Sequence, residues 1–369
     1  RSRRGAAGRI GDARVASTYQ GSRYADRLPI GTEDSLKTFE QDALRRYFQE
    51  WYRPDLMAVI AVGDFDGSVV EDLVQRHFGD LAGPAQPRER PAFGIPARSA
   101  PVITVITDPE IPRTGFNIDD QLDEPEGSTY ADYRASLTRS LFLTIANERF
   151  VTLAQDPAAF VLGAGAGTDR TNALESSWSL GGAAPEGKEV EAIRSVLTEV
   201  ARMRRHGVTE AELSRAKAAI LSSYERMYQE REKTQSGTHA EELIRVFTTG
   251  EGMPGMKAEY GFAKAWVPGI GRAEVDALAR DWMHRGSMVF QVVMPEKGGL
   301  TAITVAQIEA LLVEVEAAEI SSPESEAALG PLLADLPLDG PTVVDRGVVE
   351  ELQLVIWTLS NGVTIWLKP

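Results

Sequence analysis

The sequence predicts a mixed fold of helices and strands in which one helix–strand unit occurs twice. Residues 39–62 combine an apolar helix face with an apolar run of strand length, and residues 270–293 repeat that order. Near the end of the chain, two alternating apolar runs flank Asn361-Gly362, a strong hairpin signal. The chain has 369 residues, 43% hydrophobic and 25% charged, which are globular values and enough for two domains.

The first helix is predicted after residue 38. Thr38 and Gln41 fit a capping box, in which two side chains bond free backbone N–H groups at the start of a helix. One apolar face follows at helical spacing, formed by Leu44, Tyr47, Phe48 and Trp51. Pro54 ends this helix, and we expect the continuous apolar run 56–62 to be a strand.

A second helix is predicted from residue 68. Ser68 and Glu71 fit another capping box, and apolar residues follow at helical spacing up to Phe78. Asp64 and Asp66 precede this helix and could form a pair of catalytic carboxylates. Asp residues at this position more often end a strand and cap the following helix, and this reading is preferred.

An offset of 231 residues aligns the two units. The aligned pairs are Trp51 with Trp282, Met57 with Met288 and Val62 with Val293. Between the copies lies a Pro-rich linker, residues 83–101. Strands are then predicted near 102–107, 114–120, 159–166, 173–180 and 286–294, and helices near 129–153, 187–205, 209 onward, 236–247 and 272–283.

The spacing of the copies predicts how the chain is divided. The second copy has far more sequence before it than the first, so we expect about 130 residues of a first domain to be absent. The hairpin would then open a third domain. The predicted parts are the second half of a first domain (1–82), a linker (83–101), a second domain (102–299), an acidic linker (300–350) and an opening hairpin (351–369).

Composition excludes several classes of function. The net charge of −15 argues against nucleic acid or an anionic membrane surface as a partner. No stretch approaches 18 consecutive apolar residues, so no membrane span is predicted. Without cysteine there is neither a disulfide nor a thiolate zinc site. This suits a periplasmic or envelope compartment, although localisation stays open.

Three stretches resemble the insulinase/pitrilysin family of zinc metallopeptidases. Residues 21–66 carry LPIGTEDSL, WYRPDLM and VGDFD, residues 206–220 read HGVTEAELSRAKAAI, and the chain ends LSNGVTIWLKP. The resemblance implies an α+β fold of repeated two-layer domains like those of mitochondrial processing peptidase, with mainly antiparallel sheets packed by helices. It also implies a chamber closed by several domains, in which peptides are hydrolysed.

The sequence departs from the family at the zinc site. The family's inverted motif H-x-x-E-H supplies two zinc ligands and the general base, and a later Glu supplies the third ligand. The four histidines are His77, His206, His239 and His284, and none of them lies in such a motif. Residues 1–32 contain no Glu. We therefore predict no catalytic, cofactor-binding or metal-binding residue in this chain, and zinc only in the parent protein.

Other motifs have ordinary structural explanations. HAEEL (239–243) has one histidine near a predicted helix start and no second at i+4, which is typical of a solvated face. GAGAGTD (163–169) lacks the Lys-Ser/Thr of a phosphate loop, and its glycines would let a strand bend. Arg53-Pro54 fits a helix stop. The arginine cluster in residues 1–14 is interpreted as the frayed tail of a helix.

The sequence thus predicts a non-catalytic portion of a zinc metallopeptidase. It would form chamber wall and support the zinc-bearing half-domain, with the remaining domains of the same polypeptide as partners and a peptide as the parent's substrate. The alternative is a zinc-free pseudo-peptidase that serves as a structural or protein-binding scaffold. The two differ in whether the parent keeps its zinc site, so this chain alone is predicted to be inactive.

Overall fold

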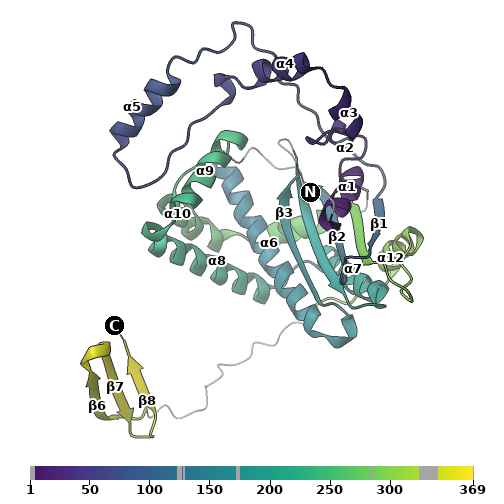
Figure 1. Ribbon diagram of the computed structural model, residues 1–369. Coiled ribbons are helices and arrows are strands. Elements are labelled where there is room, and N and C mark those ends of the chain that lie inside the picture. The colour runs from purple at the N-terminus through teal and green to yellow at the C-terminus, as the bar shows by residue number, and fades with distance from the viewer. Residues whose placement is uncertain are drawn as a thin grey trace. The chain divides into compact units, whose positions relative to one another are not determined.

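The computed structural model describes residues 5–122, 127, 129–171, 175–283, 286–323 and 340–368 (Figure 1). The chain divides into two compact units, residues 1–324 and 325–369. Among the described residues, no helix is both long and apolar enough to cross a membrane.

A five-stranded sheet organises the larger unit, with the strand order β1-β5-β2-β4-β3. Its strands are β1 (Val102–Asp108), β2 (Thr114–Leu122), β3 (Gly163–Arg170), β4 (Ser176–Ala184) and β5 (Val289–Pro295). Only β1 and β5 pair in parallel, and the other three pairings are antiparallel. All five lie within a few residues of the predicted strands.

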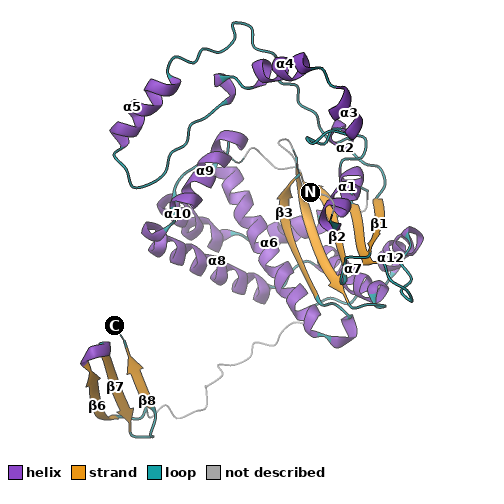
Figure 2. Ribbon diagram, viewed as in Figure 1, coloured by secondary structure: helices purple, strands orange, loops and turns teal. Residues whose placement is uncertain are grey.

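Helices cover one face of this sheet (Figure 2). The helices that contact its strands there are α6 (Tyr130–Gln155), α7 (Glu189–His206) and α12 (Val305–Ala317). Outside them, α8 (Glu210–Glu230) and α11 (Arg272–Asp281) pack against α6, and α10 (Met256–Trp266) packs against α8. Helix α9 (Ser236–Thr249) precedes α10 in the chain. Ile118, Leu180 and Phe290 face this layer and are fully buried. Phe142 of α6 packs edge-on against Trp282 with ring centroids 5.1 Å apart. The predicted two-layer α+β fold is therefore confirmed. Helix α10 was not predicted.

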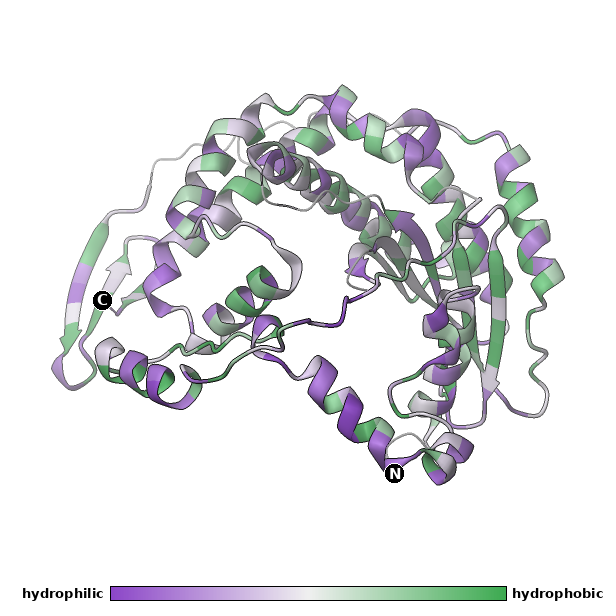
Figure 3. Ribbon diagram, turned by 90° about the horizontal axis from the view of Figure 1, so that it is seen from above, coloured by the Kyte–Doolittle hydropathy of each residue, from purple (hydrophilic) through white to green (hydrophobic). Residues whose placement is uncertain are grey.

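Threonine caps define three of the long helices. Thr129, Thr209 and Thr304 each accept a backbone N–H three residues on, and the third residue bonds back. The box of Thr209 and Glu212 begins α8, the helix predicted from residue 209. Figure 3 shows hydrophobic and hydrophilic residues interspersed along the helices of the chain.

The N-terminal part consists of helices joined by loops. They are α1 (Ala6–Thr18), α2 (Arg23–Asp26), α3 (Glu33–Thr38), α4 (Gln41–Trp51) and α5 (Gly67–Phe78). Both predicted capping boxes here are wrong. Thr38 ends α3 and Glu40 precedes α4, whereas Asp66 caps α5 through the N–H groups of Ser68 and Val69. The interpretation of Asp66 as a helix cap is confirmed.

The strand predicted at residues 56–62 is not formed. A short 3-10 helix, η2 (Pro54–Leu56), is followed by chain that pairs with no described strand, and Met57 and Val59 are exposed. A strand requires a neighbour for its backbone groups, and no described segment provides one. Trp282 is buried, but Trp51 is only partly so. The predicted repeat is therefore not present as two helix–strand units.

The smaller unit is a three-stranded antiparallel sheet of β6 (Val343–Val349), β7 (Leu354–Leu359) and β8 (Thr364–Leu367). A 3-10 turn, η6 (Glu350–Leu352), joins the first two strands. Strand β6 and helix α12 both lie within residues 300–350, the range predicted to be a linker. The domain bounds themselves stay a prediction.

The terminal hairpin predicted around Asn361-Gly362 is formed. Trp357 lies opposite Ile365, and a loop of three residues joins the two strands. Leu359 N–H bonds Val363 O at 2.8 Å across this loop, and Gly362 takes the left-handed conformation with φ 84°. Strand β6 gives β7 its second neighbour, whereas Trp366 is 66% exposed.

Candidate functional site

The polar side chains of β2 form the floor of a pocket on the open face of the sheet. Phe116 and Ile118 point into the core, so the alternating residues Asn117 and Asp119 point the other way. Asn117 Nδ2 donates to Asp119 Oδ2 at 2.7 Å. Asp169 of β3 lies on the same face of the sheet. It is the last residue of the stretch GAGAGTD (163–169), whose glycines were interpreted as part of a strand. That stretch is strand β3, as predicted.

Helix α1 lies over this face and closes one side of the pocket. Gln291 of β5 fixes it there, since its Nε2 lies 3.1 Å from Arg14 O, 2.7 Å from Ser17 Oγ and 3.1 Å from Thr18 Oγ1. Arg9 of the same helix pairs with Asp108 at 2.7 Å. The interpretation of this arginine cluster as a frayed tail is therefore wrong for Arg9 and Arg14, which lie on a docked helix. Residues 1–4 lie outside the described part.

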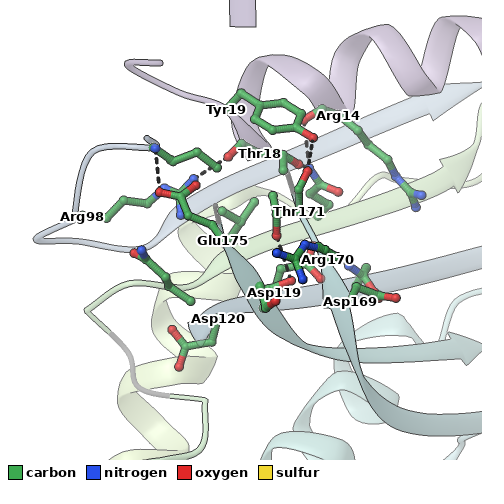
Figure 4. A pocket seen from close by; sticks show the side chains of 17 residues that line it. Arg14, Thr18, Tyr19, Arg98, Asp119, Asp120, Asp169, Arg170, Thr171 and Glu175 are labelled. Carbon is green, nitrogen blue, oxygen red and sulfur yellow. Dashed lines mark hydrogen bonds between the residues drawn. The ribbon is translucent and has the colours of Figure 1, made fainter. Parts of the chain in front are cut away.

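The remaining wall is formed by the segment before β1 and the start of β4. Arg98 donates to two backbone carbonyls, those of Thr18 and Ser287. Glu175 accepts from the N–H of Ile95 at 2.7 Å. The enclosed volume is about 310 Å³ (Figure 4).

Burial perturbs two charged groups of this pocket. Burial raises the pKa of Asp119, the hydrogen bond from Asn117 opposes the shift, and the negative charge of Asp169 adds to it. Burial also lowers the pKa of Arg98, against the attraction of Glu175, Asp119 and Asp120. Burial determines the direction of both shifts, and the opposite charges in the pocket, which include Arg14 and Arg98 for Asp119, only reduce them.

The pocket was not predicted from the sequence. Arg14, Arg98 and Asp119 are far apart in the chain, and only the docking of α1 brings them together. One signal was available, namely the polar residues Asn117, Asp119 and Gln121 at alternate positions of a predicted strand. That pattern places polar groups on one face, but it does not identify what covers them.

The described histidines do not assemble into a metal site. His206 Nε2 lies 2.7 Å from Ile320 O, and His239 Nδ1 lies 3.9 Å from Glu242. His284 lies outside the described residues. Within the described ranges, no group of three His, Cys, Asp or Glu side chains could hold a metal ion. The donor set present in these ranges therefore does not fit the catalytic zinc of the family that the sequence resembles.

The family described as the peptidase M16 inactive domain matches residues 38–220. The zinc protease PQQL-like of Arabidopsis thaliana is 27% identical over 375 residues, covering 100% of this chain and 36% of the relative. The probable zinc protease PqqL of Haemophilus influenzae is 42% identical over 69 residues, covering 19% of this chain and 8% of the relative. The chain thus spans little more than a third of the length of the Arabidopsis protein.

Two solved structures share the fold. The periplasmic protease PqqL from Escherichia coli superposes with a TM-score of 0.80 at 19% identity, covering 99% of this chain and 40% of that one. A predicted insulinase family protease from Yersinia pestis gives 0.65 at 15% identity, covering 82% and 64%. In residues 38–220 the chain thus carries the inactive domain of the M16 peptidases, and its relatives are zinc protease PqqL-like proteins.

Proposed function

We propose that this chain is the non-catalytic portion of a zinc metallopeptidase that hydrolyses peptides, and that it forms chamber wall and supports the zinc-bearing half-domain. The main observation in support is that α4 has an apolar face that is exposed to solvent. Leu44, Tyr47 and Phe48 are 60%, 55% and 59% exposed, although they share one side of an amphipathic helix. Helices of soluble proteins bury such a face against another element.

Helix α5 and the segment before it also carry exposed apolar side chains. Val69 and Phe78 are 55% and 48% exposed, and Met57 and Val59 of the unpaired apolar run are 46% and 50% exposed. An unpaired extended segment between two amphipathic helices is suited to joining the sheet of a further domain. The lengths of the relatives supply such domains, because this chain matches 36% of one and 40% of another.

The proposal predicts that peptide cleavage requires more than residues 1–369. The isolated chain with added zinc should not cleave a quenched fluorescent peptide, because its described residues offer no zinc ligand set. The longer polypeptide encoded by the same gene should cleave it and lose activity on chelation. Chelator-sensitive cleavage by the isolated chain contradicts the proposal. A longer polypeptide that neither binds zinc nor cleaves peptides supports the scaffold alternative.

A second prediction tests the surface of α4 in that longer polypeptide. Phe48→Asp should lower its melting temperature and its peptidase activity, since a charge would lie in a buried contact between domains. Gln49→Asp is the matched control, because the neighbouring position lies off the apolar face and is exposed. Differential scanning fluorimetry and peptide cleavage are the measurements. Equal effects of both variants would show that this face is not covered.

A further inference from the structure

The three strands of the smaller unit, β6, β7 and β8, are rich in apolar residues, yet none of their described residues is buried (Figure 1). Trp366 and Val348 are each 66% exposed, and Leu367 is 38% exposed. A sheet of few strands becomes stable by burying an apolar face. The sheet of the smaller unit is therefore incomplete by itself.

Apolar side chains occupy both faces of this sheet. Directly opposed residues of neighbouring strands share a face, so Trp357 and Ile365 lie on one face and Ile356 and Trp366 on the other. Strand β7 reads LVIWTL, without the alternation of apolar and polar residues that is typical of a sheet with one solvated face. Arg346 lies over Trp357, 5.2 Å from the centre of its ring, and shields part of one face. Both faces are therefore suited to being covered.

The two edges of the sheet differ in their charge. Strand β7 is central, and β6 and β8 each pair with it alone among the described residues. Strand β6 carries Asp345 and Arg346, and charged side chains on an edge strand discourage further pairing. Strand β8 reads TIWL and has no charged residue. The edge of β8 is therefore the one that favours the addition of a further strand.

The hydrogen bonds of the hairpin show which backbone groups of β8 are left for such a strand. Leu359 N–H bonds Val363 O at 2.8 Å, so these two residues form a hydrogen-bonded pair. In an antiparallel ladder such pairs alternate with pairs whose backbone groups point away from each other. Thr364 and Trp366 belong to the second kind, because they follow Val363 by one and three positions. Their N–H and C=O groups therefore point to the free edge of β8.

Two solved structures of the Escherichia coli protease PqqL indicate what completes the sheet. Its first half superposes on 88% of this chain with a TM-score of 0.79, whereas the whole protease superposes on 99%. The two coverages differ by 11% of this chain, about 40 residues. That length corresponds to the smaller unit, residues 325–369. The match in length favours a counterpart of the smaller unit in the second half of that fold.

We propose that the sheet β6–β8 joins this chain to the second half of a longer polypeptide, with a strand of that half paired to β8 and its apolar side chains covering both faces. The added strand bonds the free N–H groups of Thr364 and Trp366, and the cover buries the Trp366 ring. The inference rests on the part of the proposed function that makes this chain a portion of a longer polypeptide. A longer polypeptide that protects β8 but cleaves no peptide supports this inference and counts against the zinc peptidase.

Amide hydrogen exchange, measured by mass spectrometry with residue-level fragmentation, tests the proposal on the isolated chain and on the longer polypeptide encoded by the same gene. The amides of Thr364 and Trp366 should exchange about a hundredfold more slowly in the longer polypeptide, because only there are they bonded. Equal exchange in the two proteins overturns the proposal. Protection in the isolated chain that rises with protein concentration assigns a second copy to the sheet, and protection independent of concentration assigns the larger unit. Either result also overturns the proposal.

Variants of Trp366 test whether its face is covered. In the longer polypeptide, Trp366→Asp should restore fast exchange at Thr364, because a charge would enter a buried contact. In the isolated chain it should leave the melting temperature unchanged, because the side chain is 66% exposed there. Trp366→Phe keeps an apolar ring and should retain the protection of Thr364. Val363→Asp is the control, since it places the same charge in the loop before β8. Equal loss of protection in Trp366→Asp and Val363→Asp contradicts the proposal.

Discussion

Replacing Arg149 by methionine is expected to lower the free energy of unfolding by about 3–5 kcal/mol, because the buried carboxylate of Glu212 loses its counter-ion and that of Glu199 keeps only Arg202. Arg149 donates to Glu212 through two bonds of 2.7 and 2.9 Å, to Glu199 at 3.3 Å and to Gly207 O at 3.1 Å. The side chains of Arg149 and Glu199 are each 8% exposed and that of Glu212 is 12% exposed. Urea unfolding followed by circular dichroism measures the change.

Arg194→Met is the matched control for that prediction. Arg194 pairs with Glu314 at 2.9 Å, but the two side chains are 40% and 55% exposed, so its removal should cost about 0–1 kcal/mol.

Acid titration provides a second measurement of the Arg149 network. Burial raises the pKa of Glu212, but the hydrogen bonds from Arg149 and Thr209 and the charge of Arg149 together outweigh burial, so the pKa lies below its ordinary value. The stabilisation that ionised Glu212 contributes is present above its unfolded-state pKa and is lost as pH falls through its folded-state pKa. This loss should be smaller in Arg149→Met. A cost below about 1 kcal/mol would contradict the proposed importance of this network.

The motif HGVTEAEL could be located from the sequence, but only part of its role could be predicted. The spacing of Thr209 and Glu212 predicts a capping box, which the structure contains. The same Glu212 carboxylate also binds Arg149, a residue more than fifty positions away, and no local pattern indicates that. Gly207 has φ +69°, and a Cβ there would lie 2.1 Å from Asp276 Oδ1. The motif therefore joins three helices, α6, α7 and α8, as well as starting one.

Prediction failed where an element depends on a neighbour. The apolar run 56–62 has the composition of a strand, but strand formation requires a partner, and the described chain supplies none. The hairpin at the end was recognised from Asn361-Gly362, yet its register depends on loop length. A three-residue loop moves Trp357 opposite Ile365. The local sequence thus indicates which segments favour an extended conformation, but it does not indicate which segment each one pairs with.

The pocket under α1 depends on tertiary packing for a different reason. Strand alternation predicts that Asn117 and Asp119 share a face, and the arginines of residues 1–14 are evident in the sequence. These residues come together only because α1 lies on that face of the sheet. Gln291 of β5 holds α1 there through three contacts. Gln291 is a single buried amide inside an apolar strand. A buried amide in such a strand needs a partner, and that requirement is the one sequence signal for a cover on the open face.

Replacing Trp282 by alanine is expected to cost about 3–5 kcal/mol, whereas Trp51→Ala should cost much less. Trp282 is 0% exposed, with ring centroids 5.1 Å from Phe142 and 6.2 Å from Phe150, so its loss leaves a cavity among α6, α11 and β5. Trp51 is partly exposed and lies beneath the guanidinium groups of Arg53 and Arg88, 5.9 and 5.5 Å from its ring. These contacts are those of a surface side chain.

Urea unfolding of the two variants compares residues that the sequence aligns as equivalent. Trp282→Phe refines the test, because the indole Nε1 is buried without an acceptor among the described residues. Removing that unpaired donor while keeping an aromatic ring should make Trp282→Phe considerably milder than Trp282→Ala. Equal losses for Trp51→Ala and Trp282→Ala in the isolated chain would mean that both tryptophans are core residues, and the proposed open surface around α4 would then already be covered.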